Sequence, residues 1–510
     1  MKDKILFLTD LWFFNFGMAK FLQEKYDADF FVIYDLDDKA RKFFKNQNIV
    51  KYEKIWFYLD CLKNLPKKPD INYLREFEKK YKLNLWTIAY YDRQFNQYNS
   101  FYKFSDNEIL AILENECKFF EEILDQVKPN FVSLYFTISH YQELFRLMCL
   151  ARGIKILMFS GSKIGKTMMI SEKGLIMDNM DNSLINTQTQ YKSLENNTFE
   201  EYIKQFTMYD VLRDYIHKQF EENFWRRYKP FLKFIFSKRD NSYNLRYTYY
   251  GRTRINILKN RLSNFFKKKY RNKFINSNFI SKLSLNETFA YFPLHYEPER
   301  NLLIDAPFHC NQIEIIKNIS RSLPVNFMLY VKEHPTQKVI GWRKISYYKQ
   351  LQDLPNVRLI HPSVKPDAIL EKCKLVITIS GTAGLEAIFY KRPVIVFTDT
   401  FYSNIPSVYR IKKINDLPSV IKKALHNSSN NASIDNELSV FMNNVSNNIF
   451  VFDVTNIASD FSYRFGLKGA IMDSEISAEK IKSFINNYKS NFESLATEHI
   501  KKIKQLKDIK

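Results

Sequence analysis

The stretch TISGTAGLEA at Thr378–Ala387 joins an apolar, β-branched run to a sequence typical of a helix start. The run Leu375–Ile379 predicts a buried strand, and Ala383–Tyr390 predicts a helix. The start of a helix that carries Ser, Thr and Gly offers free backbone N–H groups and hydroxyls to an anion. Glu386 could accept a hydrogen bond from a ribose hydroxyl. The stretch therefore predicts a phosphate and ribose site in an α/β fold, or else a small-residue turn that packs a helix against a sheet.

Strands alternate with helices on both sides of this stretch. Strands are predicted at Phe289–Pro293, Phe327–Lys332, Val357–Ile360, Leu375–Ile379 and Val394–Phe397. Helices are predicted near His309–Arg321, Arg343–Gln352, Asp367–Lys372 and Ala383–Tyr390. Such alternation is typical of βαβ units and of a parallel sheet.

The first third of the chain has the same pattern. Strands are predicted at Ile5–Thr9, Phe30–Tyr34, Phe131–Phe136 and Ile154–Phe159. A capping box at Ser105–Glu108 starts a helix that runs to about Val127, and another helix covers Tyr141–Ala151. We expect an α/β domain at 1–191, a basic aromatic helical insertion at 192–283, a second α/β domain at 284–430 and a helical segment at 431–510.

Composition excludes several classes of protein. With 510 residues, 45% of them hydrophobic, the chain can bury two substantial cores. Its five cysteines form no CxxC pair, so neither a disulfide framework nor a structural zinc site is predicted. No window holds eighteen consecutive apolar residues, and the N-terminus is not typical of a secretory signal. We expect a cytoplasmic protein.

The formal net charge of +22 is concentrated in one segment. Arg226–Lys273 contains sixteen Lys or Arg residues, one Asp and many aromatic residues. This mixture favours contact with an anionic membrane surface. A nucleic-acid partner is less favoured, because no known nucleic-acid-binding spacing accompanies the charges. A simply solvated basic surface is the third interpretation.

Polar residues follow three predicted strands of the second α/β domain. His295 and Glu297 follow the first strand, and Lys332-Glu333-His334-Pro335 follows the second. The TISGTAGLEA stretch follows the fourth strand. Because ligands bind at the carboxyl ends of such strands, we expect these residues to form one site. Lys332 and His334 could supply charge and hydrogen bonds to a phosphate.

A second glycine-containing loop resembles a phosphate-binding P-loop but does not match it. Gly161–Thr167 reads GSKIGKT and follows a predicted strand. A P-loop needs four residues between its two glycines, whereas this loop has three. We interpret it as an ordinary strand-end loop.

The order of the three strand-end motifs resembles that of bacterial capsule polysaccharide biosynthesis proteins, a family that includes β-Kdo transferases. FPLHYEPE, LYVKEHP and VITISGTAGLEA are followed by KRPVIVF and by Phe401-Tyr402. The resemblance covers about Thr288–Leu417, and many members carry Gln where this chain has His295. It implies a GT-B fold, in which two Rossmann-like doubly wound domains face a cleft, and a CMP-activated sugar as donor.

The resemblance also implies roles for residues. The family's His-Pro motif, which contacts the donor phosphate, is occupied by Lys332, His334 and Pro335. Its Ser/Thr-Gly motif, which contacts the same phosphate, is occupied by Ser380, Thr382 and Gly384. Glu386 stands where a GT-B glutamate holds the ribose. The predicted donor site comprises His295, Glu297, Lys332, His334, Ser380, Gly381, Thr382, Gly384 and Glu386.

The acceptor side is less strongly marked. Asp10, at the end of the first predicted strand, is the preferred catalytic base, and Glu143 is the second choice. No DxD pair stands in a metal-ligand context, so we expect no metal and no cofactor beyond the nucleotide-sugar donor.

Together these features predict a metal-independent glycosyltransferase that acts on a lipid-linked or growing surface polysaccharide. The basic segment would hold it at the inner face of the plasma membrane as a peripheral protein. A CDP-glycerol-type glycerophosphotransferase is the alternative enzyme, and the missing Asp-Tyr-Ser-Ser run counts against it. A non-catalytic polysaccharide-binding or export component is the alternative from another class.

Overall fold

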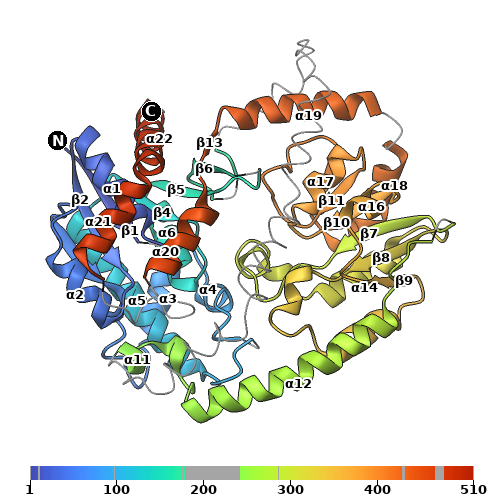
Figure 1. Cartoon of the computed structure of the whole chain (residues 1–510), viewed down its shortest axis with the longest axis horizontal. Coiled ribbons are helices and arrows are strands. Elements are labelled where there is room, and N and C mark those ends of the chain that lie inside the picture. The colour runs from blue at the N-terminus through green and yellow to red at the C-terminus, as the bar shows by residue number, and fades with distance from the viewer. Residues whose placement is uncertain are drawn as a thin grey trace. The chain divides into compact units, whose positions relative to one another are not determined.

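The computed structural model describes residues 2–178, 242–427, 431–465 and 476–508, apart from residues 10, 11, 97, 165, 175 and 285 (Figure 1). These residues divide into two compact units. The first contains the described residues up to 178, residues 242–253 and the described residues from 448 onward. The second contains residues 254–447. Within the described ranges, no helix is both long and apolar enough to cross a bilayer.

The first unit is built on a seven-stranded sheet in the order β13-β6-β5-β4-β1-β2-β3. Its strands are β1 (Asp3–Leu8), β2 (Ala28–Tyr34), β3 (Lys54–Phe57), β4 (Phe131–Tyr135), β5 (Lys155–Gly161), β6 (Thr167–Ser171) and β13 (Ile449–Val451). Strands β1 to β5 are parallel, and β6 and β13 extend one edge antiparallel. The order 3-2-1-4-5 of the parallel strands is that of a doubly wound sheet, with its switch point between β1 and β4.

Helices cover both faces of this sheet, because its strands alternate buried residues between two cores. Ile5 and Phe7 pack with α1, α2 and α20 to α22, while Leu6 and Leu8 pack with α3 to α6. The helices of this unit are α1 (Phe14–Lys25), α2 (Asp38–Asn46), η1 (Tyr58–Asp60), α3 (Ile71–Tyr81), α4 (Leu85–Tyr90), α5 (Asp106–Val127), α6 (His140–Ala151), α11 (Ser242–Leu245), η3 (Tyr247–Tyr249), α20 (Val454–Arg464), α21 (Ala478–Asn487) and α22 (Lys489–Asp508). The predicted capping box is present, with Ser105 and Glu108 bonding each other's backbone N–H groups.

The C-terminal helix α22 packs on the first unit, against α1 and the sheet (Figure 1). It passes so close to α1 that a Cβ atom at Gly17 would lie 2.6 Å from the Phe492 ring. His499 is fully buried there, and its Nε2 lies 3.3 Å from Ser133 Oγ on β4. The helical tail that the sequence predicted is therefore an integral layer of the first unit. The predicted range 431–510 is split, since α19 lies in the second unit.

The predicted insertion at 192–283 is also divided. Residues 192–241 lie outside the described residues, 242–253 join the first unit, and 254–278 form α12 of the second unit. Arg246 anchors the segment through ion pairs of 2.7 Å with Asp35 and Asp37. These carboxylates follow β2, so the segment crosses the carboxyl edge of the first sheet.

A buried histidine strengthens the same anchorage. Tyr247 donates to Asp92, whose carboxylate lies 2.7 Å from His140 Nδ1. The other ring nitrogen of His140 lies 2.9 Å from Glu116. Burial alone would lower the pKa of His140, but Glu116 and Asp92 raise it to about 10. The ring is therefore a buried imidazolium paired with two carboxylates.

The second unit has a six-stranded, all-parallel sheet in the order β12-β11-β10-β7-β8-β9. Its strands are β7 (Phe289–Pro293), β8 (Met328–Lys332), β9 (Val357–Ile360), β10 (Leu375–Thr378), β11 (Val394–Val396) and β12 (Val408–Arg410). Its helices are α12 (Arg254–Asn278), α13 (Arg300–Leu303), η4 (Pro307–His309), α14 (Gln312–Ser322), η5 (Pro335–Lys338), α15 (Ile345–Gln352), α16 (Pro366–Leu370), α17 (Ala383–Phe389), η6 (Ile414–Asp416), α18 (Leu417–Asn427) and α19 (Asn431–Ser446). This is the complete 3-2-1-4-5-6 order of a Rossmann-like sheet. The predicted fold class, two Rossmann-like α/β domains with a helical C-terminal segment, is confirmed.

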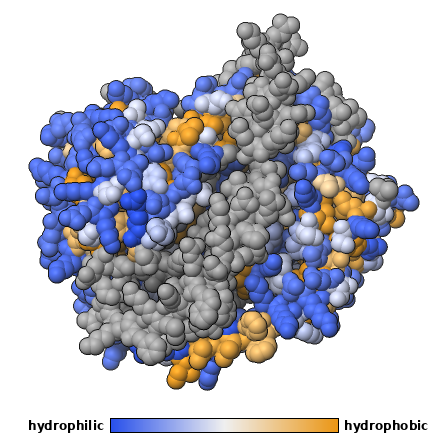
Figure 2. Space-filling view, viewed as in Figure 1, coloured by the Kyte–Doolittle hydropathy of each residue, from blue (hydrophilic) through white to orange (hydrophobic). Residues whose placement is uncertain are grey.

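Helix α12 has a single buried residue, Ile275, among its 25 residues. Only its C-terminal part is buried, through Ile275 and Phe274 in the core of the second sheet. Figure 2 shows apolar side chains at the lower rim, where Figure 1 draws α12. The predicted helical and basic character of 254–273 is thus present in the structure.

The loop Gly161–Thr167 is the turn of a β-hairpin. Strand β5 ends at Gly161, and β6 begins at Thr167 and pairs with β5 antiparallel. A P-loop requires a helix after its second glycine, and here a strand follows. The loop is therefore not a P-loop.

The contact between α1 and α22 predicts a steric test. Gly17→Ala places a methyl group against the Phe492 ring, and we expect it to destabilise the first unit by about 1–3 kcal/mol. Gly161→Ala is the matched control, because no atom lies within 4 Å of a Cβ there. Urea unfolding followed by circular dichroism measures both variants. Equal midpoints for the two variants would contradict the tight contact.

Candidate functional site

The carboxyl ends of β7, β8 and β10 meet at one edge of the second sheet, because β7 lies between β10 and β8. The switch point of the sheet is between β7 and β10, where doubly wound sheets bind ligands. His295 follows β7, and its Nε2 lies 3.2 Å from Thr378 Oγ1 and accepts from the Ser380 N–H at 3.4 Å. Thr378 Oγ1 accepts from the Gly381 N–H at 3.1 Å. The loop after β7 thus positions the turn of the TISGTAGLEA stretch.

A buried guanidinium joins the loops after β7 and β8. Arg343 Nε donates to Glu333 at 2.8 Å, and another of its nitrogens lies 2.7 Å from Glu297. Its third nitrogen donates to the carbonyl oxygen of His295. Tyr348 OH donates to Glu333 at 2.6 Å. Two carboxylates from different strand ends share one cation, which fixes the loops relative to each other.

Two glutamine side chains complete this framework. Gln312 accepts from the His295 N–H at 2.8 Å and donates to the His295 carbonyl at 3.2 Å. Gln337 bonds the N–H and carbonyl of Glu297 in the same way, at 3.1 and 3.2 Å. The backbone after β7 is therefore satisfied by side chains rather than by secondary structure.

His334 presents a hydrogen-bond donor. Its Nδ1 accepts from the backbone N–H of Thr336 at 3.2 Å, so the proton of the neutral ring is on Nε2. Burial, together with the charges of Lys332 and Arg343, lowers the pKa of His334 to about 4. At pH 7 this residue is a neutral donor and not a cation.

Lys332 and Glu386 are ionisable residues of the site whose pKa values lie near neutral pH. Burial lowers the pKa of Lys332 to about 8, and nearby carboxylates, Glu386 first, oppose this shift. Burial raises the pKa of Glu386 to about 7, with Asp367 adding to the shift and Lys332 opposing it. Near neutral pH both groups can therefore change protonation when an anion binds.

The start of α17 offers backbone donors. The N–H groups of Thr382 and Ala383 form no hydrogen bond with the residues that the structure describes. The Ser380 hydroxyl donates to the Asn301 carbonyl at 3.4 Å. A Cβ at Gly384 would lie 2.2 Å from the Tyr402 hydroxyl, which donates to the Gly381 carbonyl. Gly384 therefore serves the close packing of Tyr402, and its contact with a phosphate stays a prediction.

Of the two candidate catalytic bases, Asp10 and Glu143, the structure describes Glu143. Asp10 lies outside the described residues. Glu143 is buried and accepts from Arg146 at 2.6 and 2.9 Å and from the Thr137 hydroxyl at 2.8 Å. With both oxygens bonded, Glu143 is placed as a structural ion pair, and a base role would require it to exchange these partners.

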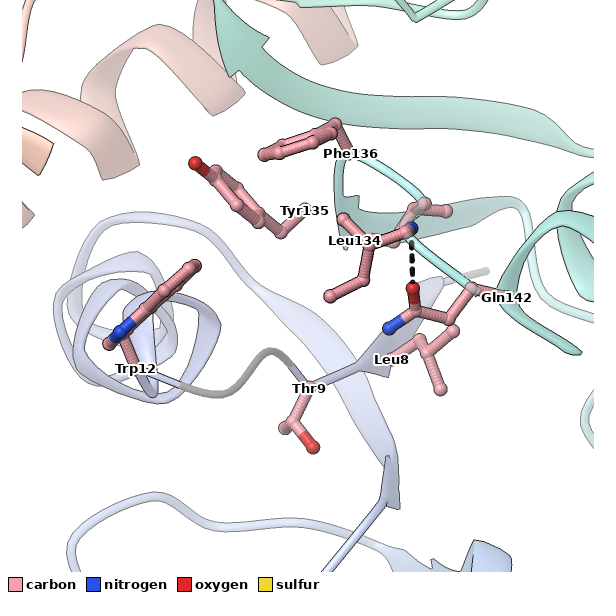
Figure 3. A pocket seen from close by; sticks show the side chains of 8 residues that line it. Leu8, Thr9, Trp12, Leu134, Tyr135, Phe136 and Gln142 are labelled. Atoms are coloured by element: carbon pink, nitrogen blue, oxygen red, sulfur yellow. Dashed lines mark hydrogen bonds between the residues drawn. The ribbon is translucent and has the colours of Figure 1, made fainter. Parts of the chain in front are cut away.

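A pocket lies at the switch point of the first sheet (Figure 3). Leu8 and Thr9 from the end of β1 and Leu134 from β4 form its floor. Its aromatic side chains are those of Trp12, Tyr135 and Phe136. The ring of Trp12 lies edge-on to Tyr135 with centroids 5.9 Å apart. Gln142 accepts from the Ile138 N–H at 2.8 Å, and its amide nitrogen donates to the Tyr141 hydroxyl at 3.5 Å.

The structure brings together the three predicted strand-end motifs, although their role in donor binding stays a prediction. Sequence reasoning missed the residues that hold them: Gln312, Glu333, Gln337, Arg343 and Tyr348. Glu333 lies inside the predicted motif Lys332-Glu333-His334-Pro335. No local sequence pattern indicates Arg343, because its partners are ten and more residues away. Within the described residues, no group of three His, Cys, Asp or Glu side chains could hold a metal ion.

The ion pairs of Arg343 predict a large loss of stability on substitution. Arg343→Met leaves Glu333 buried without its cation, which costs about 3–5 kcal/mol. Arg321→Met, at an exposed arginine of α14, is the control and should change stability by less than about 0.5 kcal/mol. Urea unfolding of the full chain measures both. An unchanged midpoint for Arg343→Met would show that the loops do not depend on this cation.

Comparisons with known proteins identify the family that this chain matches. Residues 200–406 match the family model described as capsule polysaccharide biosynthesis protein. No curated protein matches the chain. Among solved structures, the Thermosulfurimonas dismutans KpsC, a beta Kdo 2,7 transferase, is 11% identical with a TM-score of 0.30, covering 76% of this chain and 98% of that chain.

A UDP-GlcNAc 2-epimerase from Neisseria meningitidis is also 11% identical, with a TM-score of 0.22 and coverage of 88% and 100%. These TM-scores are too low for either likeness to support a function. The family match, in contrast, spans all three motifs that follow β7, β8 and β10. Over residues 200–406 this chain matches the capsule polysaccharide biosynthesis family, as its strand-end motifs predicted.

Proposed function

We propose that this protein is a glycosyltransferase of capsule polysaccharide synthesis. It would transfer a sugar from a nucleotide-activated donor, of the CMP-Kdo type, to a lipid-linked or growing polysaccharide. The observation that carries the proposal is the meeting of three family motifs at the switch point of the second sheet. That edge holds a neutral histidine donor, a lysine and two backbone N–H groups that have no partner among the described residues.

These groups suit the phosphate of a nucleotide-sugar donor. His334 Nε2–H and the N–H groups of Thr382 and Ala383 would donate to its oxygens, and Lys332 would supply positive charge. Protein donors of this kind stabilise a leaving phosphate without a metal ion, so we propose a metal-independent enzyme of the GT-B type. Glu386 would accept from a ribose hydroxyl, and His295 would position the Ser380-Gly381 turn rather than contact the sugar.

The acceptor would bind to the first unit. Asp10 directly follows Thr9, which lines the aromatic pocket of Figure 3. We propose Asp10 as the group that takes the proton of the acceptor hydroxyl, and Glu143 only as an alternative. A lipid-linked acceptor would place the protein as a peripheral enzyme at the inner face of the plasma membrane.

Nucleotide binding tests the donor site. We expect CMP at about 100 times its dissociation constant to stabilise the wild type by about 2.7 kcal/mol. His334→Ala should weaken CMP binding about 10- to 100-fold, because it removes a hydrogen bond to a charged group worth about 1.5–3 kcal/mol. Thermal-shift titrations with CMP, CDP, UMP and UDP measure this, with His426→Ala on exposed α18 as control.

The nucleotide that stabilises the protein distinguishes among the alternative functions. A response to CDP or UDP alone would change the donor and keep the site. Stabilisation by CMP that survives in His334→Ala would contradict the assigned role of His334. No response to any nucleotide would favour a non-catalytic polysaccharide-binding protein.

The titration of Lys332 predicts a pH dependence of CMP binding. A bound phosphate favours the protonated ammonium, and Lys332 loses its proton as the pH rises through about 8. Glu386 gains negative charge as the pH rises through about 7, which acts in the same direction. Affinity should therefore fall as pH rises, by about tenfold between pH 7 and 9. Isothermal titration calorimetry of the wild type and of Lys332→Gln measures this pH dependence of CMP affinity. Lys332→Gln should bind CMP weakly, with little change in affinity above pH 8. A wild-type affinity that does not change with pH would overturn the role of Lys332.

A further inference from the structure

Helix α12 exposes an apolar stripe that is interrupted by lysines. The exposed fractions are 65% for Ile255, 54% for Leu262, 65% for Phe265, 66% for Phe266 and 69% for Tyr270. Leu258 is 45% exposed. At 100° per residue, these six side chains fall within an arc of about 140°. The stripe is about 22 Å long, at 1.5 Å per residue from Ile255 to Tyr270.

The opposite face of α12 attaches the helix to the second unit. Ile275 is fully buried, and Phe274 packs against the same core. Arg271 donates to the carbonyl oxygens of Gly341 and Trp342 at 3.0 and 2.8 Å. The exposed stripe is therefore not needed to hold the helix in place.

The charge of α12 is entirely positive. Its 25 residues include no Asp or Glu and eight basic residues: Arg254, Lys259, Arg261, Lys267, Lys268, Lys269, Arg271 and Lys273. Lys259, Lys269 and Lys273 lie on the same side as the apolar stripe, and each is exposed. A helix that exposes aromatic and aliphatic side chains on one side, with lysines among them, is suited to the interface of an anionic bilayer.

We propose that α12 is the membrane-binding element of this protein, with its apolar stripe in the headgroup region of an anionic bilayer. Its lysines contact lipid phosphates, while their aliphatic stems extend along the apolar side chains. The membrane location is part of the proposed function, and this inference rests on it in naming the surface that makes the contact. A nucleic-acid duplex would pair with the lysines but would leave the apolar stripe in water.

Vesicle flotation of the full chain tests the proposal. The wild type should float with phosphatidylcholine vesicles that contain phosphatidylglycerol, and not with phosphatidylcholine alone. Phe265→Ser with Phe266→Ser should lower the partition coefficient about tenfold or more, because two exposed aromatic anchors are lost. Phe308→Ser is the matched control: this residue is 86% exposed in the same unit but lies outside α12.

A second pair of variants tests the charge. Lys259→Gln with Lys269→Gln should weaken partition about fivefold per residue, as expected for basic groups near anionic lipid. Lys365→Gln with Lys422→Gln removes the same charge from exposed positions elsewhere in the second unit and should have little effect. Because all four lysines are exposed, the unfolding midpoints should not change.

Several results would overturn the proposal. Flotation of the Phe265/Phe266 variant like wild type would do so, and so would equal wild-type binding to both vesicle types or to neither. Retention on duplex DNA that depends on the same two phenylalanines would assign the stripe to nucleic acid instead. CMP stabilisation is measured on the same variants, so failure of the membrane contact is distinguished from failure of the donor site.

Discussion

The candidate site depends on one buried cation, Arg343. Its guanidinium is paired with Glu333 and Glu297, which follow two different strands, and it also bonds the backbone of His295. A buried charge is costly unless it is paired and bonded, so the loops have one low-energy arrangement. Through His295 this arrangement extends to Thr378 and the turn at Ser380. Hydrogen-bond donors after two strands, β8 and β10, are held in place in this way, and such preorganisation is what stabilises charge on a phosphate.

The two units use the same sheet topology with different side chains at the switch point. In the second unit that edge is polar and titratable, with groups suited to an anion. In the first unit it is lined by Trp12, Tyr135 and Phe136. These side chains present aromatic surface and carry no charge. The two sheets are therefore alike in topology and differ in the chemistry of the side chains at this edge.

The basic residues of the chain have different structural environments, which the net charge alone does not show. In α12, Lys259, Lys269 and Lys273 lie among exposed apolar residues. Arg246, from the same predicted basic segment, is instead buried between Asp35 and Asp37. One arginine thus stabilises the fold, while lysines farther along the chain, in α12, are exposed. Charge counting in sequence could not separate these two uses, because they differ only in what lies opposite each side chain.

By itself the sequence determined the local structure and the chemical character of the site. Apolar runs that alternate with helical segments predicted nine strands of the two sheets, because buried parallel strands must be apolar. The strand-end motifs predicted which residues meet at the edge of the second sheet. Tertiary structure alone decided the partners that lie far apart in sequence: Arg343 with Glu297, Phe492 with Gly17, and β13 with β6. It also decided that His334 is a neutral donor. These outcomes depend on burial and on distances between separate segments, and no local pattern of residues encodes either.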